Sequence, residues 1–84
     1  GEGALMFAVD VPPEHALAEG PALVDGYMLQ SDASSKGAAL LASASKKKPI
    51  WVIAHFLRIE VLKERRVPVL LVEEALPNLF DPPP

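Results

Sequence analysis

The assignment of the fold depends most on Ile50-Trp51-Val52-Ile53-Ala54-His55-Phe56-Leu57-Arg58-Ile59-Glu60-Val61-Leu62. The first five residues are apolar, and β-branched and aromatic side chains dominate them, which predicts a buried strand over 50–54. Apolar and charged residues alternate from Leu57 to Val61, as in a strand, but this alternation is not sustained. The charged run at 63–66 is typical of a helix end, so we interpret residues 55–66 as a helix.

Apolar runs in the rest of the chain predict three further strands, at 5–9, 22–29 and 67–72. Asp25-Gly26 weakens the middle of the second of these strands, and Pro68 lies near the start of the third. Two more helices are expected between the strands, at 14–19 and 36–48. Residues 1–3 and 77–84 are predicted to be irregular ends, the second because it finishes in three prolines.

This order of elements alternates strand and helix, which predicts an α/β fold with a mostly parallel four-stranded sheet, in a small three-layer, Rossmann-like unit. A parallel sheet must be covered on both faces, and three short helices are too few for four apolar strands. We therefore expect part of one face, or one edge, to stay bare. The 84 residues are interpreted as a single small domain or a fragment of a larger Rossmann-like domain, completed by another copy or by a larger parent chain.

Composition excludes several classes of function. The chain of 84 residues has a net charge of −3 and no cysteine. The charge argues against nucleic-acid binding, and the absence of cysteine excludes disulfides and thiolate metal sites. Neither a membrane-spanning apolar run nor a signal peptide is recognisable, so we expect no membrane partner and a cytoplasmic location. Because Gln30 and Asn78 are the only side-chain amides, the composition also favours a thermophilic source.

In open parallel sheets, ligands bind beyond the carboxyl ends of the strands, which here are Asp10, the loop 30–35 and His55. The loop leads into a predicted helix start and offers hydroxyls, one ammonium group and a glycine that permits close approach, a combination that suits a phosphate. Asp32 would repel a phosphate unless it binds sugar hydroxyls, and an ordinary helix cap explains the same residue types. The candidate ligand-binding residues are Asp32, Ser34, Ser35, Lys36, Gly37 and His55.

No catalytic residue, metal site or cofactor is predicted. His55 could act as an acid or base, but it could equally be a surface histidine at a strand end. His15 is expected to face solvent, and two histidines without a third ligand at suitable spacing do not indicate a metal. The glycine-rich dinucleotide and phosphate-loop motifs are absent from the sequence, as is a nucleophile elbow.

A resemblance to a known family is carried by the segments 5–10, 16–24, 35–41, 49–54 and, faintly, 78–82. These segments resemble the C-terminal Rossmann-like domain of the translation initiation factor 2B-related family, which includes methylthioribose-1-phosphate isomerase and ribose-1,5-bisphosphate isomerase. The isomerases have a catalytic Asp in a Gly-Ala-Asp sequence and a catalytic Cys, whereas this chain has Gly26-Tyr27-Met28 and no cysteine. The resemblance therefore implies phosphate contacts at Lys36 and Gly37 and no catalytic residue.

Three functions follow as expectations. The first is a non-catalytic or incomplete α/β module that assembles with itself or a larger chain and binds a phosphorylated metabolite at Ser34-Ser35-Lys36-Gly37. The second is an aldose–ketose type of sugar-phosphate isomerase that another chain completes. The third is a pure protein-interaction module whose function resides in an apolar sheet edge.

Overall fold

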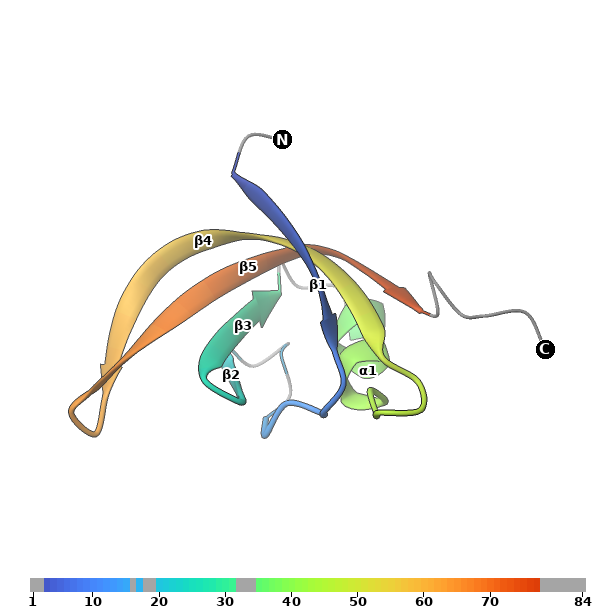
Figure 1. Ribbon diagram of the computed structural model, residues 1–84, viewed down its shortest axis with the longest axis horizontal. Coiled ribbons are helices and arrows are strands. Elements are labelled where there is room, and N and C mark those ends of the chain that lie inside the picture. The colour runs from blue at the N-terminus through green and yellow to red at the C-terminus, as the bar shows by residue number, and fades with distance from the viewer. Residues whose placement is uncertain (1–2, 16, 18–19, 32–34, 78–84) are drawn as a thin grey trace.

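The computed structural model describes residues 3–15, 17, 20–31 and 35–77. It contains the strands β1 (Ala4–Val9), β2 (Ala22–Val24), β3 (Tyr27–Ser31), β4 (Ile50–Leu62) and β5 (Arg65–Pro77), and the helix α1 (Ser35–Ala42). The five strands form one sheet in the order β1-β4-β5-β3-β2. Figure 1 shows β4 and β5 as an arch, with α1, β2 and β3 beneath it.

The sheet is mixed. β1 pairs with β4, β4 with β5 and β2 with β3, all antiparallel, and the pairing of β3 with β5 is parallel. A turn of two residues, Lys63 and Glu64, joins the two 13-residue strands β4 and β5. Both turn residues have positive φ, at 47° and 68°. This is the backbone that a two-residue hairpin needs to match the right-handed twist of its strands.

The prediction of a Rossmann-like α/β unit with a mostly parallel four-stranded sheet is wrong. Residues 55–66 do not form a helix, because β4 continues to Leu62 and the chain then reverses into β5. The predicted strand at 22–29 is in fact two strands, separated by a turn at Asp25 and Gly26, whose φ is +87°. Two tight turns therefore replace the crossover helices that a parallel sheet would require.

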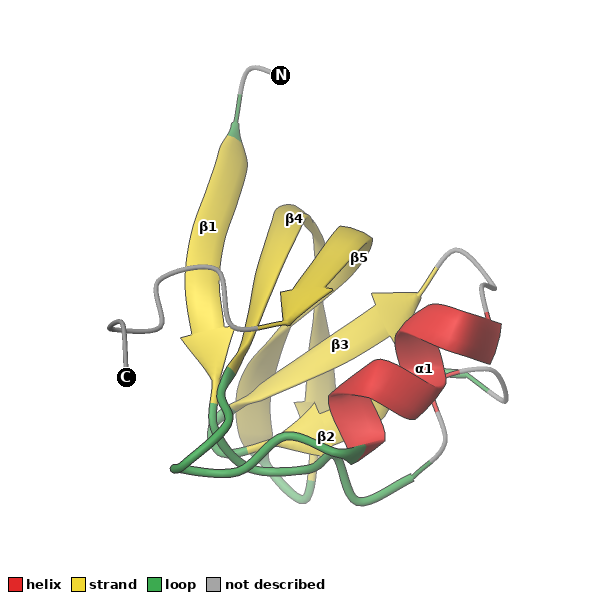
Figure 2. Ribbon diagram, turned by 90° about the vertical axis from the view of Figure 1, so that its right-hand side faces the viewer, coloured by secondary structure: helices red, strands yellow, loops and turns green. Residues whose placement is uncertain are grey.

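Helix content is lower than predicted. The expected helix at 36–48 ends at Ala42, and the backbone of Ser45 and Lys48 is joined by reciprocal hydrogen bonds of 3.1 Å in a turn before Pro49. The expected helix at 14–19 lies largely outside the described residues. Within the described part of the chain, α1 is the only α-helix, and it packs against β5. Figure 2 shows it to one side of the strands, next to β3.

The core lies between the sheet and the elements beneath the arch. Its fully buried side chains include Leu29 of β3, Leu41 of α1 and Val52 of β4. Trp51 and Ile53 alternate with buried residues of β4 and pair with Ala8 and Met6 of β1, so this second set points to the outer face of the sheet. The strand over 50–54 was predicted to be buried, but Trp51 within it is only half-buried. None of the described helical residues covers this outer face.

Candidate functional site

The predicted phosphate loop is only partly described. Asp32 and Ser34 lie outside the described residues, and so does the side chain of Ser35. Lys36, which is exposed, and Gly37 lie in the first turn of α1 and line a cavity of about 280 Å³. The other lining residues are Ser31, Leu40 and Leu41, together with residues 72–75 of β5. The structure thus places two of the predicted contacts beside a cavity.

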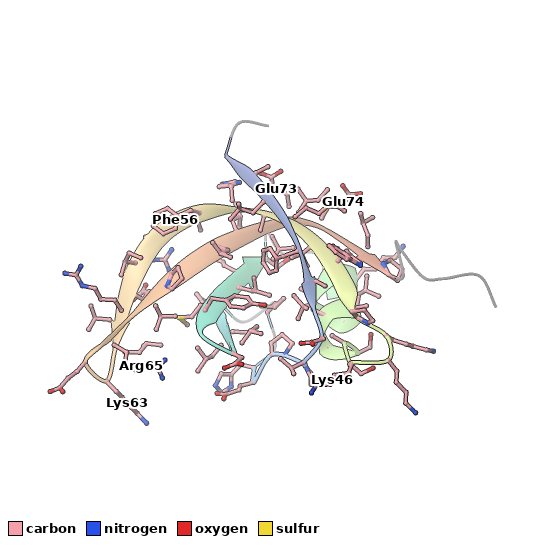
Figure 3. All side chains as sticks on the ribbon, viewed as in Figure 1. Lys46, Phe56, Lys63, Arg65, Glu73 and Glu74 are labelled. Atoms are coloured by element: carbon pink, nitrogen blue, oxygen red, sulfur yellow. The ribbon has the colours of Figure 1, made fainter. Side chains whose placement is uncertain are left out.

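His55 lies within β4 rather than at the end of a strand. Its Nδ1 atom is 2.5 Å from Oε1 of Glu73, and Glu73 also lines the cavity next to Lys36. Glu73 and its neighbour Glu74 were missed in the sequence analysis, because the predicted fourth strand stopped at Val72. Glu73 bonds to His55 and Glu74 pairs with Ile53, so both carboxylates lie on the outer face of the sheet, whereas α1 lies beneath the arch (Figures 1 and 3). Among the described residues that line the cavity, Lys36 is the one cation.

A larger cavity, of about 560 Å³, lies where the far end of the β4–β5 hairpin approaches β2 and residues 11–14. It is lined by apolar residues that include Leu23, Leu62 and Val67, and by charged residues of both signs. Figure 3 shows Lys63 and Arg65 at this end of the arch. The sequence analysis did not anticipate this cavity, because it depends on the hairpin bending back towards β2.

Tyr27 is a perturbed titratable group of the core. Burial raises the pKa of Tyr27 above its usual value of 10.0, and the carboxylates of Asp10 and Asp25 raise it further. Its ring meets that of Phe7 edge-to-face, with centroids 5.5 Å apart. The phenol therefore stays protonated at neutral pH, and its ring helps to anchor β1 to β3.

Exposed apolar side chains gather on the part of the hairpin beyond β1. We call this part the arm and define it as residues 56–62 of β4, the turn 63–64 and residues 65–69 of β5. Phe56, Ile59 and Val61 are 52%, 48% and 66% exposed, whereas Val52 and Ala54 of the same strand are fully buried. Figure 3 shows Phe56 on the outer side of the arch.

Strand pairing defines the faces of the arm. Leu62 and Val67 line the cavity beneath the arch. Because side chains alternate along a strand, Ile59 and Val61 point to the opposite, outer face. Leu57, which is 37% exposed, lies at the register shift between Phe56 and Arg58, where this alternation is interrupted. The outer face of the arm is therefore largely apolar.

One edge of the arm is open. β1 pairs with β4 only from Ile50 to His55, so no described strand lies beside residues 56–62 on that side. Leu62 and Arg65 flank the two-residue turn and form a hydrogen-bonded pair, so Glu60 and Arg58 also direct their backbone groups to β5. The N–H and C=O groups of Ile59 and Val61 consequently point to the open edge. An open edge with apolar side chains is a template for pairing with another strand.

Charge is present on the arm as an ion pair within β4. Nε of Arg58 donates to Oε1 of Glu60 at 2.8 Å, and both side chains are exposed. These residues lie two positions apart and therefore share the face opposite to Ile59. Arg58 and Glu60 therefore lie beside the open edge, on the face of the arm opposite to the exposed apolar side chains.

The comparisons with known proteins find no family model, no curated protein and no solved structure that matches the chain. The relationship to the translation initiation factor 2B-related family stays a prediction, although the Rossmann-like fold that it implied is not the fold of this chain. Within the described residues, no helix is long and apolar enough to cross a bilayer. The same residues contain no cluster of three or more side chains suited to a metal ion.

Proposed function

We propose that this chain is a non-catalytic assembly module that binds a protein partner through the arm. The observation that carries the proposal is the concentration of exposed apolar side chains, Phe56, Leu57, Ile59 and Val61, beside an open strand edge. Of the three expected functions, this corresponds to the interaction module with an apolar sheet edge. The chain was also expected to assemble with itself or with a larger chain. The arm would be the surface that mediates this assembly.

The energetics favour a partner on the arm. Full burial of one large aliphatic or aromatic side chain contributes roughly 1.5–3 kcal/mol, and these residues still expose between 37% and 66% of their surface. Covering four of them would thus supply several kcal/mol. Pairing of the open backbone edge would add direction and register to this non-directional term. An exposed apolar strand edge without a partner is an aggregation hazard, which is a second reason to expect one.

The proposal is tested with the purified chain and an apolar fluorescent dye. We expect the wild type to bind the dye, and the double variant I59K/V61K to bind it much more weakly because its charges occupy the outer face of the arm. The matched control is Ala39→Lys, which adds a charge at an exposed position of α1. Circular dichroism checks that all three proteins are folded. Equal dye binding by the folded double variant and the wild type would refute the arm as a docking surface.

Binding of a phosphorylated metabolite at Lys36 and Gly37 is a second candidate function, and the cavity that these residues line favours it. Among the described residues that line this cavity, Lys36 is the one cation, so we expect affinities no tighter than millimolar. Isothermal titration with sugar phosphates and nucleotides tests this function. Weak heat that disappears in Lys36→Ala would support it. No heat at millimolar ligand, or an unchanged affinity in Lys36→Ala, would rule it out.

The isomerase alternative gains no support from the described residues, because the His55–Glu73 pair lies on an exposed strand surface. A cytoplasmic location stays a prediction from the composition.

A further inference from the structure

We propose that the partner of the arm is a second copy of this chain, whose β4 pairs antiparallel with β4 of the first across the open edge. A two-fold axis would pass between Ile59 and the partner's Ile59. This inference rests on the proposed function, because it uses the same surface, and it adds the identity of the partner and the register of the contact. A two-fold interface requires a patch that is complementary to itself, and the arm has this property in three respects.

The first is the backbone. Ile59 directs both its N–H and its C=O to the open edge, because it lies between the residues that bond to β5. Two such residues placed opposite each other exchange two hydrogen bonds, as in any antiparallel ladder. Pro68, which lies opposite Ile59 on β5, fits this assignment, since that position needs no N–H towards β4.

The second is charge. With Ile59 on the axis, Arg58 lies opposite the partner's Glu60, and Glu60 lies opposite the partner's Arg58. All four side chains are on one face, where Arg58 and Glu60 of the same chain are already 2.8 Å apart. Moving the axis by one residue places either the two Arg58 side chains or the two Glu60 side chains directly opposite each other. Like charges that face each other across strands are destabilising, so charge selects one register.

The third is the apolar outer face of the arm. β4 pairs regularly with β5 from Arg58 to Leu62, after the register shift between Phe56 and Arg58. In the proposed register Ile59 lies opposite the partner's Ile59 on the outer face. The apolar outer faces of the two arms therefore meet, and the two five-stranded sheets become continuous. These cross-strand pairs are the unit that stabilises a sheet.

Charge reversal tests the register. Sedimentation velocity over a range of concentrations should show the wild type associating to twice the mass of the 9.0 kDa chain. R58E and E60R alone each place like charges opposite each other twice per dimer, so each should raise the Kd by about tenfold or more. An equimolar mixture of R58E and E60R restores both opposite-charge pairs and should recover the dimer. The double variant R58E/E60R should dimerise like the wild type.

A second variant tests the backbone. Ile59→Pro removes an N–H that points to the open edge and leaves the hydrogen bonds to β5 in place, so it should abolish the dimer. Fluorescence and circular dichroism establish that the variant is folded, and Pro at position 59 is compared with Ile59→Ala, which keeps the N–H and should dimerise more strongly than the proline variant.

The outcomes separate this inference from the proposed function. A wild type that stays at 9.0 kDa up to millimolar concentration refutes the second copy, while the dye experiment still decides whether the arm binds another protein. A dimer that I59K/V61K disrupts, but that R58E and E60R do not weaken, refutes the proposed register and leaves the arm as a docking surface. The proposed register is also refuted if the equimolar mixture of R58E and E60R does not recover the dimer that each variant alone has lost.

Discussion

The two halves of β4 have similar composition but very different surroundings. In the first half, Val52 and Ala54 are fully buried, because β1 and β5 pair on either side and the elements beneath the arch cover one face. In the second half, Phe56 and Val61 stay more than half exposed, although they are paired with β5. Strand pairing satisfies the backbone, but only a second layer or a partner removes apolar side chains from water. The exposed half is therefore where a function in binding is best supported.

The largest effect is expected from comparing truncations in the core and in the arm. Leu29→Ala removes a fully buried side chain and should lower the free energy of unfolding by about 2–5 kcal/mol. Ile59→Ala should lower it by less than about 1 kcal/mol when measured on the monomer, because half of the side chain is already in water. Urea denaturation at low protein concentration measures both. A similar loss at the two positions would show that the arm belongs to the cooperative core.

The turn of the arm offers a stabilising change. Lys63 and Glu64 both adopt positive φ, which costs free energy for residues with a Cβ atom. The double variant K63N/E64G supplies the sequence preferred in such turns and should stabilise the chain by about 1 kcal/mol. The control is Gly26→Ala, which introduces a Cβ at a φ of +87° and should destabilise it. An unchanged urea midpoint in K63N/E64G would indicate that the arm unfolds independently of the rest of the sheet.

A pH dependence of stability is expected from Tyr27, which packs against the core. The pKa of Tyr27 is raised in the folded protein, mainly by burial, so folding favours the protonated phenol. The stability that this group contributes is fully present below about pH 10 and is lost as the pH rises through the higher pKa of the folded state. Thermal unfolding between pH 8 and pH 11 should show this loss in the wild type and a smaller one in Tyr27→Phe. Identical curves for the two proteins would argue against it.

The smallest effect is expected for the ion pair of the arm in the monomer. Arg58→Ala should change the stability of the isolated chain by less than about 0.5 kcal/mol, because exposed ion pairs are largely solvated. Urea denaturation at concentrations below any association measures this value. A decrease in the free energy of unfolding well above 1 kcal/mol would mean that Arg58 stabilises the sheet beyond the arm. A negligible loss of stability in Arg58→Ala would mean that the effect of Arg58 is to be sought in dimerisation.

The sequence analysis found the extended segments better than their arrangement. The apolar runs at 5–9, 50–54 and 67–72 all lie within strands of the structure. The error at 55–66 arose because the charged run at 63–66 was taken for a helix end. Lys63 and Glu64 instead form the turn of the hairpin, and Arg65 and Arg66 begin β5. A two-residue turn interrupts the alternation of apolar and polar residues just as the end of a strand does.

The ligand contacts expected at the loop stay a prediction, although Lys36 and Gly37 line a cavity. The pairing of His55 with Glu73 could not be anticipated, because it depends on the register of β4 against β5. The arm was missed as a site, since residues 56–66 were assigned to a helix.

Local chemistry in the amino-acid sequence was sufficient to identify apolar segments suited to strands and a chain without cysteine chemistry. The direction of each strand pair, the bend of the hairpin and the face left without cover arose only when distant segments met. Two-residue turns allow adjacent strands to run antiparallel without any crossover. Which face then remains in water depends on the packing of α1 and the β2–β3 hairpin beneath the arch, which are long-range contacts that no local pattern encodes.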